Sequence, residues 1–483
     1  MFIGIDIGTS AVKVVVISSE GRELASASSP LSLQTPRRNW CEQQPETWWE
    51  ATLTACAELR SGKPDAWAAA RAIGLSGQMH GAVMLGGELE VLRPAILWND
   101  GRSMAQCKAM EARMPEIGSI CGVPAMPGMT APKILWMKEN EPDTYSRIRH
   151  ILLPKDFVRL RLTGELATDM ADAAGTMWLD EANRAWSDSL CSVSATNPDW
   201  LPRLLEGPEI SGQLSKEAAS ALGLPAGIPV AAGGGDASTG AMGIGAVHDG
   251  DAFISLGTSG QLFVCSSAFQ PNAASAVHAF AHCVPGRWSV IAAMLNGASP
   301  MQWFAGVART EIAELLKAAQ SEDGRIPYFL PYLTGERTPH NDAEIRGGFL
   351  GLEPATSNAA MMHAVVDSIA YTFCDARDAI EAAGREITSP AAIGGGARSD
   401  FVLQTMSDAL GIPISRYKGA ETGPALGAAR LGMIASGAAT VAEAAVKPDV
   451  DRIFEPDLAR ADYHAERLDS WRKLYLALKD VRL

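Results

Sequence analysis

The chain has 483 residues, of which 47% are hydrophobic and 20% are charged, and its formal net charge is -14. This is a globular composition, which argues against a disordered chain or a collagen-like repeat. The acidic balance argues against broad binding to nucleic acid or to anionic membranes, because both need clustered Lys and Arg.

The sequence also argues against export and membrane insertion. No apolar run reaches the ~18–20 residues of a membrane span, and residues 1–6 lack the basic region of a signal peptide. The eight cysteines include no CxxC pair, which is typical of reduced thiols and not of a disulfide framework or a zinc site. We therefore expect a cytoplasmic protein. At roughly 100–200 residues per domain, the chain length predicts two or three domains.

Two β-rich runs open the chain, at residues 2–7 and 12–18, and Gly8-Thr9-Ser10 lies between them. Two strands joined by a tight turn predict a β-hairpin. The turn presents backbone N–H groups and two hydroxyls beside Asp6.

The same pattern returns near the middle of the chain, where Gly257-Thr258-Ser259 lies between two further strand-like runs. Because the flanking strands match as well, we interpret the chain as a duplicated lobe, with lobes at residues 1–246 and 247–483. Asp6 of the first copy corresponds to Ser255 of the second. A duplication that keeps its acid on one side suggests a single active site between the lobes.

Apolar residues recur at helical spacing around residues 49–59, 362–373 and 468–478, which predicts three amphipathic helices. Strand runs alternate with helical segments along the chain. This alternation predicts an α/β fold, with loops near residues 31–45 and 331–351.

A glycine run at residues 233–235 follows an apolar strand and leads into Asp236. This position is the carboxyl end of a strand, where α/β sheets place their ligands. Asp236 can cap the following helix or act there as a general base, and the local sequence leaves both interpretations open.

Two more glycine-rich segments lie at residues 394–396 and 423–429. Glycines allow a backbone to approach a flat or anionic ligand closely, although a tight turn or close helix packing explains each segment equally well. The motifs GxxxxGK[ST] and GxGxxG and a protein-kinase catalytic set are absent. The paired glycine–hydroxyl turns offer another way to bind phosphate.

Polar clusters at residues 78–81 (Gln-Met-His-Gly) and 98–102 (Trp-Asn-Asp-Gly-Arg) each end an apolar run. Together they supply the acceptors, donors and aromatic face that a polyol substrate needs. His80 could equally be a core histidine with its hydrogen bonds satisfied.

These motifs resemble the FGGY family of carbohydrate kinases over almost the whole chain. The resemblance lies in residues 6–10 (DIGTS), 40–45 (WCEQQP), 78–81 (QMHG), 128–136 (GMTAPKILW) and 394–399 (GGGARS). Residues 153–156 (LPKD), 174–178 (AGTMW) and 335–341 (GERTPHN) are similar to the bacterial members that phosphorylate D-xylulose.

The resemblance implies two ribonuclease-H-like lobes of the actin/hexokinase-like ATPase fold, with a cleft between them. It implies transfer of the γ-phosphoryl group of ATP to the 5-hydroxyl of D-xylulose with Mg²⁺, which feeds the pentose phosphate pathway. A homodimer is an expectation at the level of the family.

By motif position, the resemblance makes Asp236 the general base and Asp6 the second essential carboxylate, beside the metal and phosphates. The sugar-binding residues that it implies are Met79, His80, Asn99 and Asp100. The nucleotide-binding residues that it implies are Thr9, Ser10, Lys13, Gly257, Thr258, Ser259, Gly395, Gly396 and Ser399.

One position departs from the family. Its members usually carry Asn or Gln directly after the catalytic Asp, and here that residue is Ala237. A missing polar contact can change substrate preference, so another pentulose or a pentitol such as ribulose or xylitol is an alternative substrate. A non-kinase actin-like ATPase and a regulatory sugar-binding protein are two alternatives from other classes. Retention of both Asp6 and Asp236 argues against the latter.

Overall fold

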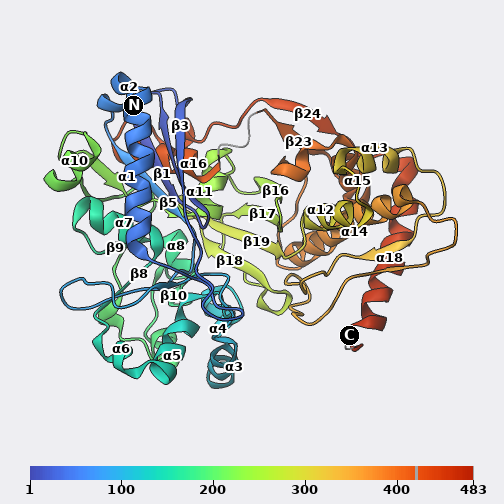
Figure 1. Cartoon of the computed structure of the whole chain (residues 1–483), viewed down its shortest axis with the longest axis horizontal. Helices are drawn as coiled ribbons and strands as arrows, with labels where there is room; N and C mark the ends of the chain where they lie inside the picture. The colour runs from blue at the N-terminus through green and yellow to red at the C-terminus, as the bar shows by residue number, and fades with distance from the viewer. Residues whose placement is uncertain (419–422, 482–483) are drawn as a thin grey trace.

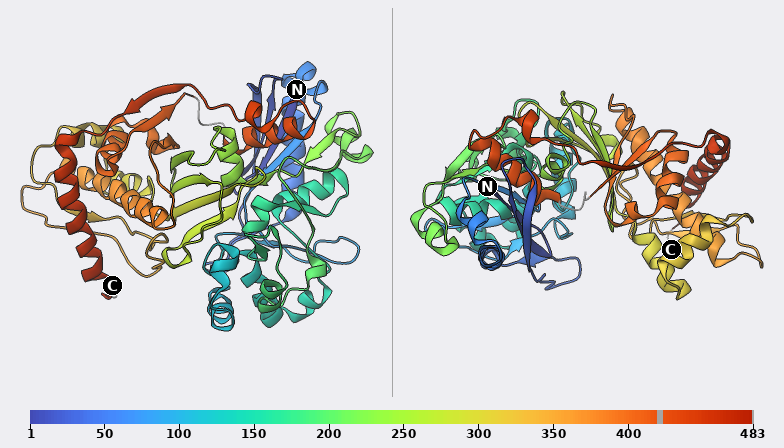
Figure 2. Two further views of the ribbon diagram at one scale, coloured as in Figure 1. Left: turned by 180° about the vertical axis from the view of Figure 1, so that it is seen from behind. Right: turned by 90° about the horizontal axis from the view of Figure 1, so that it is seen from above.

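The computed structural model describes residues 1–418 and 423–481 as two lobes that lie side by side (Figures 1 and 2). Each lobe contains a seven-stranded sheet. The N-terminal sheet has the order β13 (Ile210–Gln213), β14 (Pro229–Ala231), β5 (Ile73–Gly77), β1 (Phe2–Ile7), β2 (Ala11–Ile17) and β3 (Glu23–Pro30), with β15 (Gly234–Gly235) also on β5. The C-terminal sheet has the order β18 (Val277–Ala281), β19 (Trp288–Met294), β17 (Gly260–Ser266), β16 (Ala252–Leu256), β22 (Ala391–Ile393), β23 (Ile414–Tyr417) and β24 (Val450–Phe454).

The two sheets share one arrangement of strands. In each, the predicted hairpin is antiparallel (β1–β2 and β16–β17), a third antiparallel strand follows its second strand, and two parallel strands follow its first. The strands β3-β2-β1-β5-β14 therefore correspond to β19-β17-β16-β22-β23. The structure confirms the duplication that the two glycine–hydroxyl turns predicted.

Helices cover the sheets, and short two-stranded ribbons extend the lobes. The N-terminal half contains α1 (Pro45–Gly62), α2 (Pro64–Ala68), α3 (Met104–Arg113), α4 (Ile117–Cys121), α5 (Thr130–Asn140), α6 (Pro142–Arg147), α7 (Pro154–Thr163), α8 (Met170–Ala174), α9 (Asp188–Val193), α10 (Lys216–Leu222) and α11 (Asp236–Gly243). The C-terminal half contains α12 (Ser299–Ala308), α13 (Ile312–Gln320), α14 (Asn358–Glu381), α15 (Asp400–Leu410), α16 (Gly423–Ala435), α17 (Val441–Ala444) and α18 (Ala461–Leu478). The ribbons are β4 (Glu42–Gln43) with β7 (Ala95–Ile96), β6 (Val83–Leu85) with β8 (His150–Leu152), β9 (Ala167–Asp169) with β12 (Arg203–Leu205), β10 (Leu179–Asp180) with β11 (Ala185–Trp186), and β20 (Tyr328–Leu330) with β21 (Gly348–Leu350).

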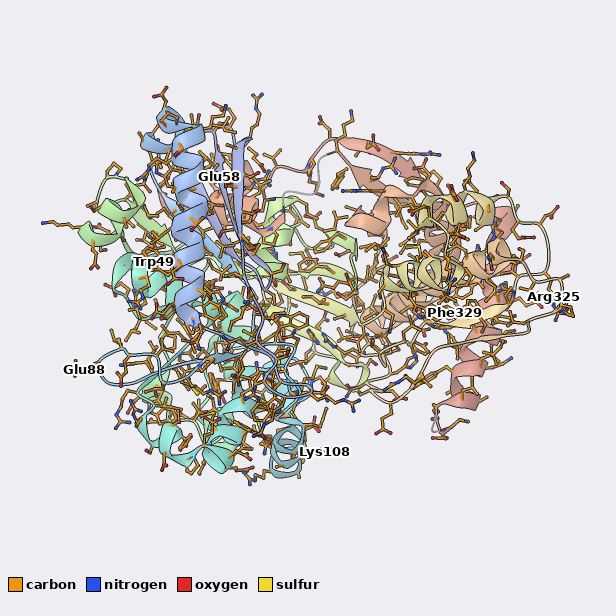
Figure 3. The ribbon with its side chains drawn as sticks, viewed as in Figure 1. Trp49, Glu58, Glu88, Lys108, Arg325 and Phe329 are labelled. Atoms are coloured by element: carbon orange, nitrogen blue, oxygen red, sulfur yellow. The ribbon has the colours of Figure 1, made fainter. Side chains whose placement is uncertain are left out.

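The three helices predicted from apolar spacing are α1, α14 and α18. In α1, Leu59 is buried while the neighbouring Glu58 is exposed, and Figure 3 labels Trp49 and Glu58 on this helix. No helix in the described part of the chain is long and apolar enough to cross a membrane. All eight cysteines are free thiols, as their spacing predicted.

Two helices cross between the lobes. Helix α11 begins in the N-terminal half, yet its Ala241 packs with Phe253 and Phe263 of the C-terminal sheet. Helix α16 does the reverse, since Ala429 packs with Val15 of the N-terminal sheet. The strands of each sheet thus all come from one predicted lobe, 1–246 or 247–483. In contrast, α11 of the first lobe packs on the C-terminal sheet, and α16 of the second packs on the N-terminal sheet. The boundary itself stays a prediction.

This crossed packing of α11 and α16 depends on backbones that lie in direct contact. A Cβ atom on Gly74 of β5 would lie 1.7 Å from the carbonyl oxygen of Ala428, and one on Gly427 would lie 1.8 Å from that of Thr239. Only glycine leaves room for α16 at both places. For the glycine-rich segment at residues 423–429, the structure therefore supports the interpretation as close helix packing.

We predict that Gly74→Ala destabilises the protein, because the new methyl group overlaps the α16 backbone. Overpacking of this kind costs about 1–3 kcal/mol or more, so the midpoint of thermal unfolding should fall. Gly62→Ala is the matched control, since a Cβ on this last residue of α1 meets no atom within 4 Å. Equal midpoints for the two variants would contradict the packing argument.

Candidate functional site

Two carboxylates meet at one edge of the N-terminal sheet. Asp6 of β1 pairs with Ser76 of β5, and Ser76 pairs with Gly234 of β15. Asp236 follows β15 directly as the first residue of α11. Both acids are therefore placed at the carboxyl ends of neighbouring strands, as the sequence predicted for a ligand site.

Ser76 links this edge to helix α11. Its hydroxyl donates to Oδ1 of Asp6 at 2.8 Å and lies 2.7 Å from the hydroxyl of Thr239 on α11. Asp236 accepts a hydrogen bond from the N–H of Ala237 at 2.7 Å. The capping position of α11 is Gly235, which has no side chain to cap the helix. Of the two interpretations of Asp236, the structure therefore does not support the helix cap.

The surroundings make both carboxylates weaker acids than usual. Burial raises the pKa of Asp236 to about 7, and the nearby charge of Asp6 acts in the same direction. Burial raises the pKa of Asp6 to about 6, against the hydrogen bond from Ser76 and the positive charge of Lys13, which faces Asp6 across the hairpin. A carboxylate with a pKa near 7 is suited to accept a proton at neutral pH.

Met79 packs next to Asp236, and His80 follows it in the chain. A Cβ on Gly235 would lie 2.7 Å from Cγ of Met79, so Met79 packs against the residue that precedes Asp236. Nδ1 of His80 lies 2.8 Å from the carbonyl oxygen of Gly175, which only accepts. Burial lowers the pKa of His80 to about 3, so the ring is neutral, Nδ1 donates its proton and Nε2 is left as an acceptor.

Lys133 supports this turn and was not singled out from the sequence. His80 has a φ of 72°, and Nζ of Lys133 donates to the carbonyl oxygens of His80 and Gly128, both at 2.8 Å. Burial lowers the pKa of Lys133 to about 7. Its signal in the sequence was a lysine inside an otherwise apolar helix at residues 130–137.

The second polar cluster has a different arrangement. Asn99 is exposed, whereas Asp100 is 2% exposed. One oxygen of Asp100 accepts from the N–H of Cys41 at 2.6 Å and from Nη2 of Arg102 at 2.7 Å, and the other from Nε of Arg102 at 2.9 Å. Asp100 therefore holds its own loop, and a contact of Asp100 with a sugar stays a prediction.

The first glycine–hydroxyl turn is tied to both polar clusters. The hydroxyl of Thr9 donates to Oε1 of Gln78 and accepts from Nε1 of Trp98, both at 3.0 Å. Ser10 is exposed at the same turn. The fold thus brings this turn next to residues that lie about 70 to 90 positions away in the chain.

A pocket of about 1110 Å³ opens in the C-terminal lobe. Its volume exceeds the ~300–1,000 Å³ of typical ligand sites. Part of its wall is apolar, including Trp303 and Phe401. Ser259 is exposed at the turn but does not line the pocket. Five of the predicted nucleotide-binding residues line it: Gly257, Thr258, Gly395, Gly396 and Ser399.

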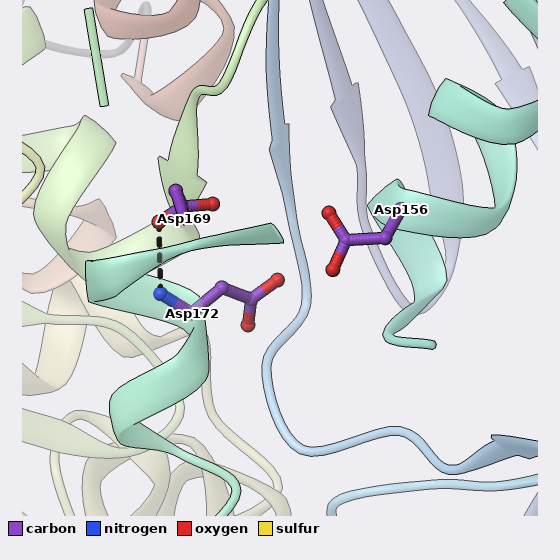
Figure 4. A group of neighbouring side chains, drawn as sticks. All are labelled: Asp156, Asp169 and Asp172. Carbon is purple, nitrogen blue, oxygen red and sulfur yellow. Dashed lines mark hydrogen bonds between the residues drawn. The ribbon is translucent and has the colours of Figure 1, made fainter. Parts of the chain in front are cut away.

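A buried acidic cluster lies beneath the strand that leads to Asp236. Figure 4 shows Asp156, Asp169 and Asp172, whose carboxylates face one another. Three such groups can hold a metal ion, but Nζ of Lys155 already lies 2.6, 2.6 and 3.0 Å from their oxygens. This ammonium takes the place that a cation would occupy, so we assign the cluster a structural role.

Comparisons with known proteins agree with the sequence prediction. The N-terminal domain of the FGGY family of carbohydrate kinases matches residues 1–243, and its C-terminal domain matches residues 252–436. A xylulose kinase from Escherichia coli (strain K12) is 43% identical over 482 residues, which are 99% of this chain and 99% of that protein. One from Klebsiella pneumoniae is 41% identical over 486 residues and covers 100% of both.

The fold has close counterparts among solved structures. The crystal structure of a xyloylose kinase from Brucella ovis matches with a TM-score of 0.96 and 42% sequence identity, and the match covers 99% of each chain. The predicted fold class, two α/β lobes of the actin/hexokinase-like ATPase fold, is confirmed. With both domain models matched in order along one chain, the protein belongs to the FGGY family of carbohydrate kinases.

Proposed function

We propose that this chain transfers the γ-phosphoryl group of ATP to the 5-hydroxyl of D-xylulose. The observation that carries the proposal is Asp236, a carboxylate with a pKa of about 7 at a strand end next to Met79. The full-length relatives named xylulose kinases support the choice of sugar.

Asp236 acts as the general base. The 5-hydroxyl donates a hydrogen bond to the Asp236 carboxylate, its oxygen attacks the γ-phosphorus, and its proton passes to Asp236 as ADP leaves. Met79 forms a wall of the sugar site and limits water near the base. Neutral His80 accepts a hydrogen bond from another hydroxyl of the sugar through Nε2, which has no hydrogen bond within the described residues.

The nucleotide lies with its adenosine in the pocket of the C-terminal lobe, where Gly395 and Gly396 allow close approach. The hydroxyls and N–H groups of both glycine–hydroxyl turns bind the phosphates. Lys13, which lowers the pKa of Asp6 through its positive charge, offsets part of their charge.

The residues fit a magnesium ion beside Asp6. Oxygen ligands suit Mg²⁺, and Oδ1 of Asp6 bonds Ser76 while no hydrogen bond to Oδ2 occurs within the described residues. A cation would also favour the ionised form of this carboxylate, which burial disfavours. When bound, Mg²⁺ neutralises charge on the phosphates. Asp6 would hold it, and the buried cluster around Lys155 would not.

The choice of sugar is the part of the proposal with a specific alternative. Ala237 is half-buried beside the base and offers only its methyl group, so another pentulose or a pentitol is the second candidate. A homodimer, a cytoplasmic location and the absence of nucleic-acid and membrane partners stay predictions.

We predict that Asp236→Asn loses at least the ~10²–10⁴-fold that a positioned base contributes to the rate. ATP should still bind, because Asp236 does not line the nucleotide pocket. The measurements are sugar-dependent ADP release and calorimetric binding of ATP. Asp323→Asn, an exposed carboxylate in the C-terminal lobe, is the matched control. Near-normal turnover in the Asp236 variant would rule out its role as the base.

The activity should depend on pH through Asp236. Only the ionised carboxylate accepts a proton, and its pKa is raised to about 7, so kcat/KM should fall as the pH is lowered through about 7. It should level off at higher pH, where the carboxylate is fully ionised. A profile that is flat between about pH 5.5 and 8 would mean that no group with this pKa limits the reaction.

A substrate panel tests the sugar. ADP release with Mg-ATP is measured for pentuloses, hexuloses, pentitols and glycerol, with a control that contains no sugar. We expect D-xylulose to give the highest rate over the control. Ala237→Asn should change the ranking if this position contacts the sugar. A different best sugar would correct the specificity, and equal release with and without every sugar would overturn the kinase assignment to this chain.

A further inference from the structure

The guanidinium of Arg337 in the C-terminal lobe makes no hydrogen bond or ion pair within the described residues. It lies on the long connection between β20 and β21 and is half-buried. Burial lowers its pKa, and the charge of Glu336 acts in the opposite direction. The Glu336 carboxylate is hydrogen-bonded to backbone N–H groups, and no carboxylate of the described residues lies within ion-pair distance of the Arg337 guanidinium. Arginines removed from water are normally paired, so this side chain lacks the partner that its position calls for.

The backbone of Arg337 is firmly held. The carboxylate of Glu336 accepts from the N–H of Leu295 at 2.6 Å and from the N–H of Arg337 itself at 2.7 Å. On the other side, the hydroxyl of Thr338 donates to the carbonyl oxygen of Ala276 at 2.8 Å, and its N–H donates to that of Ala293 at 3.2 Å. Arg337 is thus fixed between two anchored neighbours, next to the ends of β18 and β19.

This position faces the sugar side of the N-terminal lobe. Phe280 of β18 lies near His80, with ring centroids 6.4 Å apart, and near His278, with centroids 5.1 Å apart. The charge of Arg337 lowers the pKa of both histidines, which burial already lowers. Both rings are therefore neutral. The other charged group that acts on His80 is the cation Lys133.

The two lobes offer complementary groups at this place. His80 of the N-terminal lobe presents Nε2 as an acceptor, whereas the guanidinium of Arg337 only donates. A sugar hydroxyl can donate to Nε2 of His80 or accept from the guanidinium of Arg337. A ketose carbonyl can only accept, and so can bind only the guanidinium. The acceptor of His80 and the donor of Arg337 thus belong to different lobes.

We propose that Arg337 binds the sugar directly, by donating hydrogen bonds to its oxygens. This proposal rests on the proposed function. The sugar oxygens are then the hydrogen-bond acceptors that the guanidinium lacks within the described residues. Because Arg337 belongs to the C-terminal lobe and His80 to the N-terminal lobe, the sugar bridges the two lobes.

The test compares Arg337→Met, Arg337→Lys and Arg346→Met in the full chain. Arg346 is exposed on the same connection between β20 and β21, so it is the matched control. Loss of hydrogen bonds from a charged donor should raise the KM for D-xylulose about 10- to 100-fold in Arg337→Met. The Lys variant should be intermediate because it keeps the charge but loses the planar fork. The KM for ATP and ADP release without sugar should stay within about 2-fold of the wild type.

Calorimetric binding of D-xylulose to the nucleotide-free variants separates sugar binding from folding. We expect weaker binding by Arg337→Met at an unchanged midpoint of thermal unfolding. If Arg337→Met does not fold, the Lys variant gives the same comparison. Unchanged sugar affinity, or equal losses for sugar and ATP, would overturn the assignment of Arg337 alone. A wild-type protein that phosphorylates no sugar in the panel would overturn the proposed function as well.

Discussion

The contact between backbones at α16 is the constraint on which the rest of the structure depends. Gly74 and Gly427 let α16 lie directly on strand β5 and on helix α11, so the chain needs no side chains to fill the space between them. Helix α11 is then held between α16 and the C-terminal sheet. Its first residue, Asp236, is thereby fixed relative to both lobes, which is what a base needs when one lobe holds the sugar and the other the nucleotide.

The irregular segment before Asp236 explains a group of buried charges. Gly233 has a φ of 86°, and the strand breaks between β14 and β15, so its carbonyl groups need partners other than a neighbouring strand. Arg159 donates to the carbonyl oxygens of Ala231 and Ala232. Its charge is balanced by Asp156, which also pairs with Lys155. Unsatisfied buried carbonyls are costly, so this network stabilises the strand end that leads to Asp236.

Electrostatics differ sharply between the two ends of the proposed sugar site. At one end, burial raises the pKa values of Asp6 and Asp236, and the charge of Asp6 adds to the rise at Asp236, so this end gains from a cation or a proton. At the other end, Lys133 and Arg337 lie around neutral histidines, so this end gains from oxygen acceptors. A polyol that gives up a proton at one end and accepts hydrogen bonds at the other matches this polarity.

The sequence by itself determined the local elements and the chemistry-bearing turns. The hairpins around Gly8 and Gly257, the helices α1, α14 and α18 and the position of Asp236 at a strand end follow from periodicity and glycine placement, which act over a few residues. The tertiary structure decided the packing of α11 and α16 on the opposite lobes, the hydrogen bond from the N–H of Cys41 to Asp100 and the support of His80 by Lys133. It also placed Arg337 near His80. Such pairings depend on which surfaces the packed backbones bring together, and spacing along one chain contains no record of that.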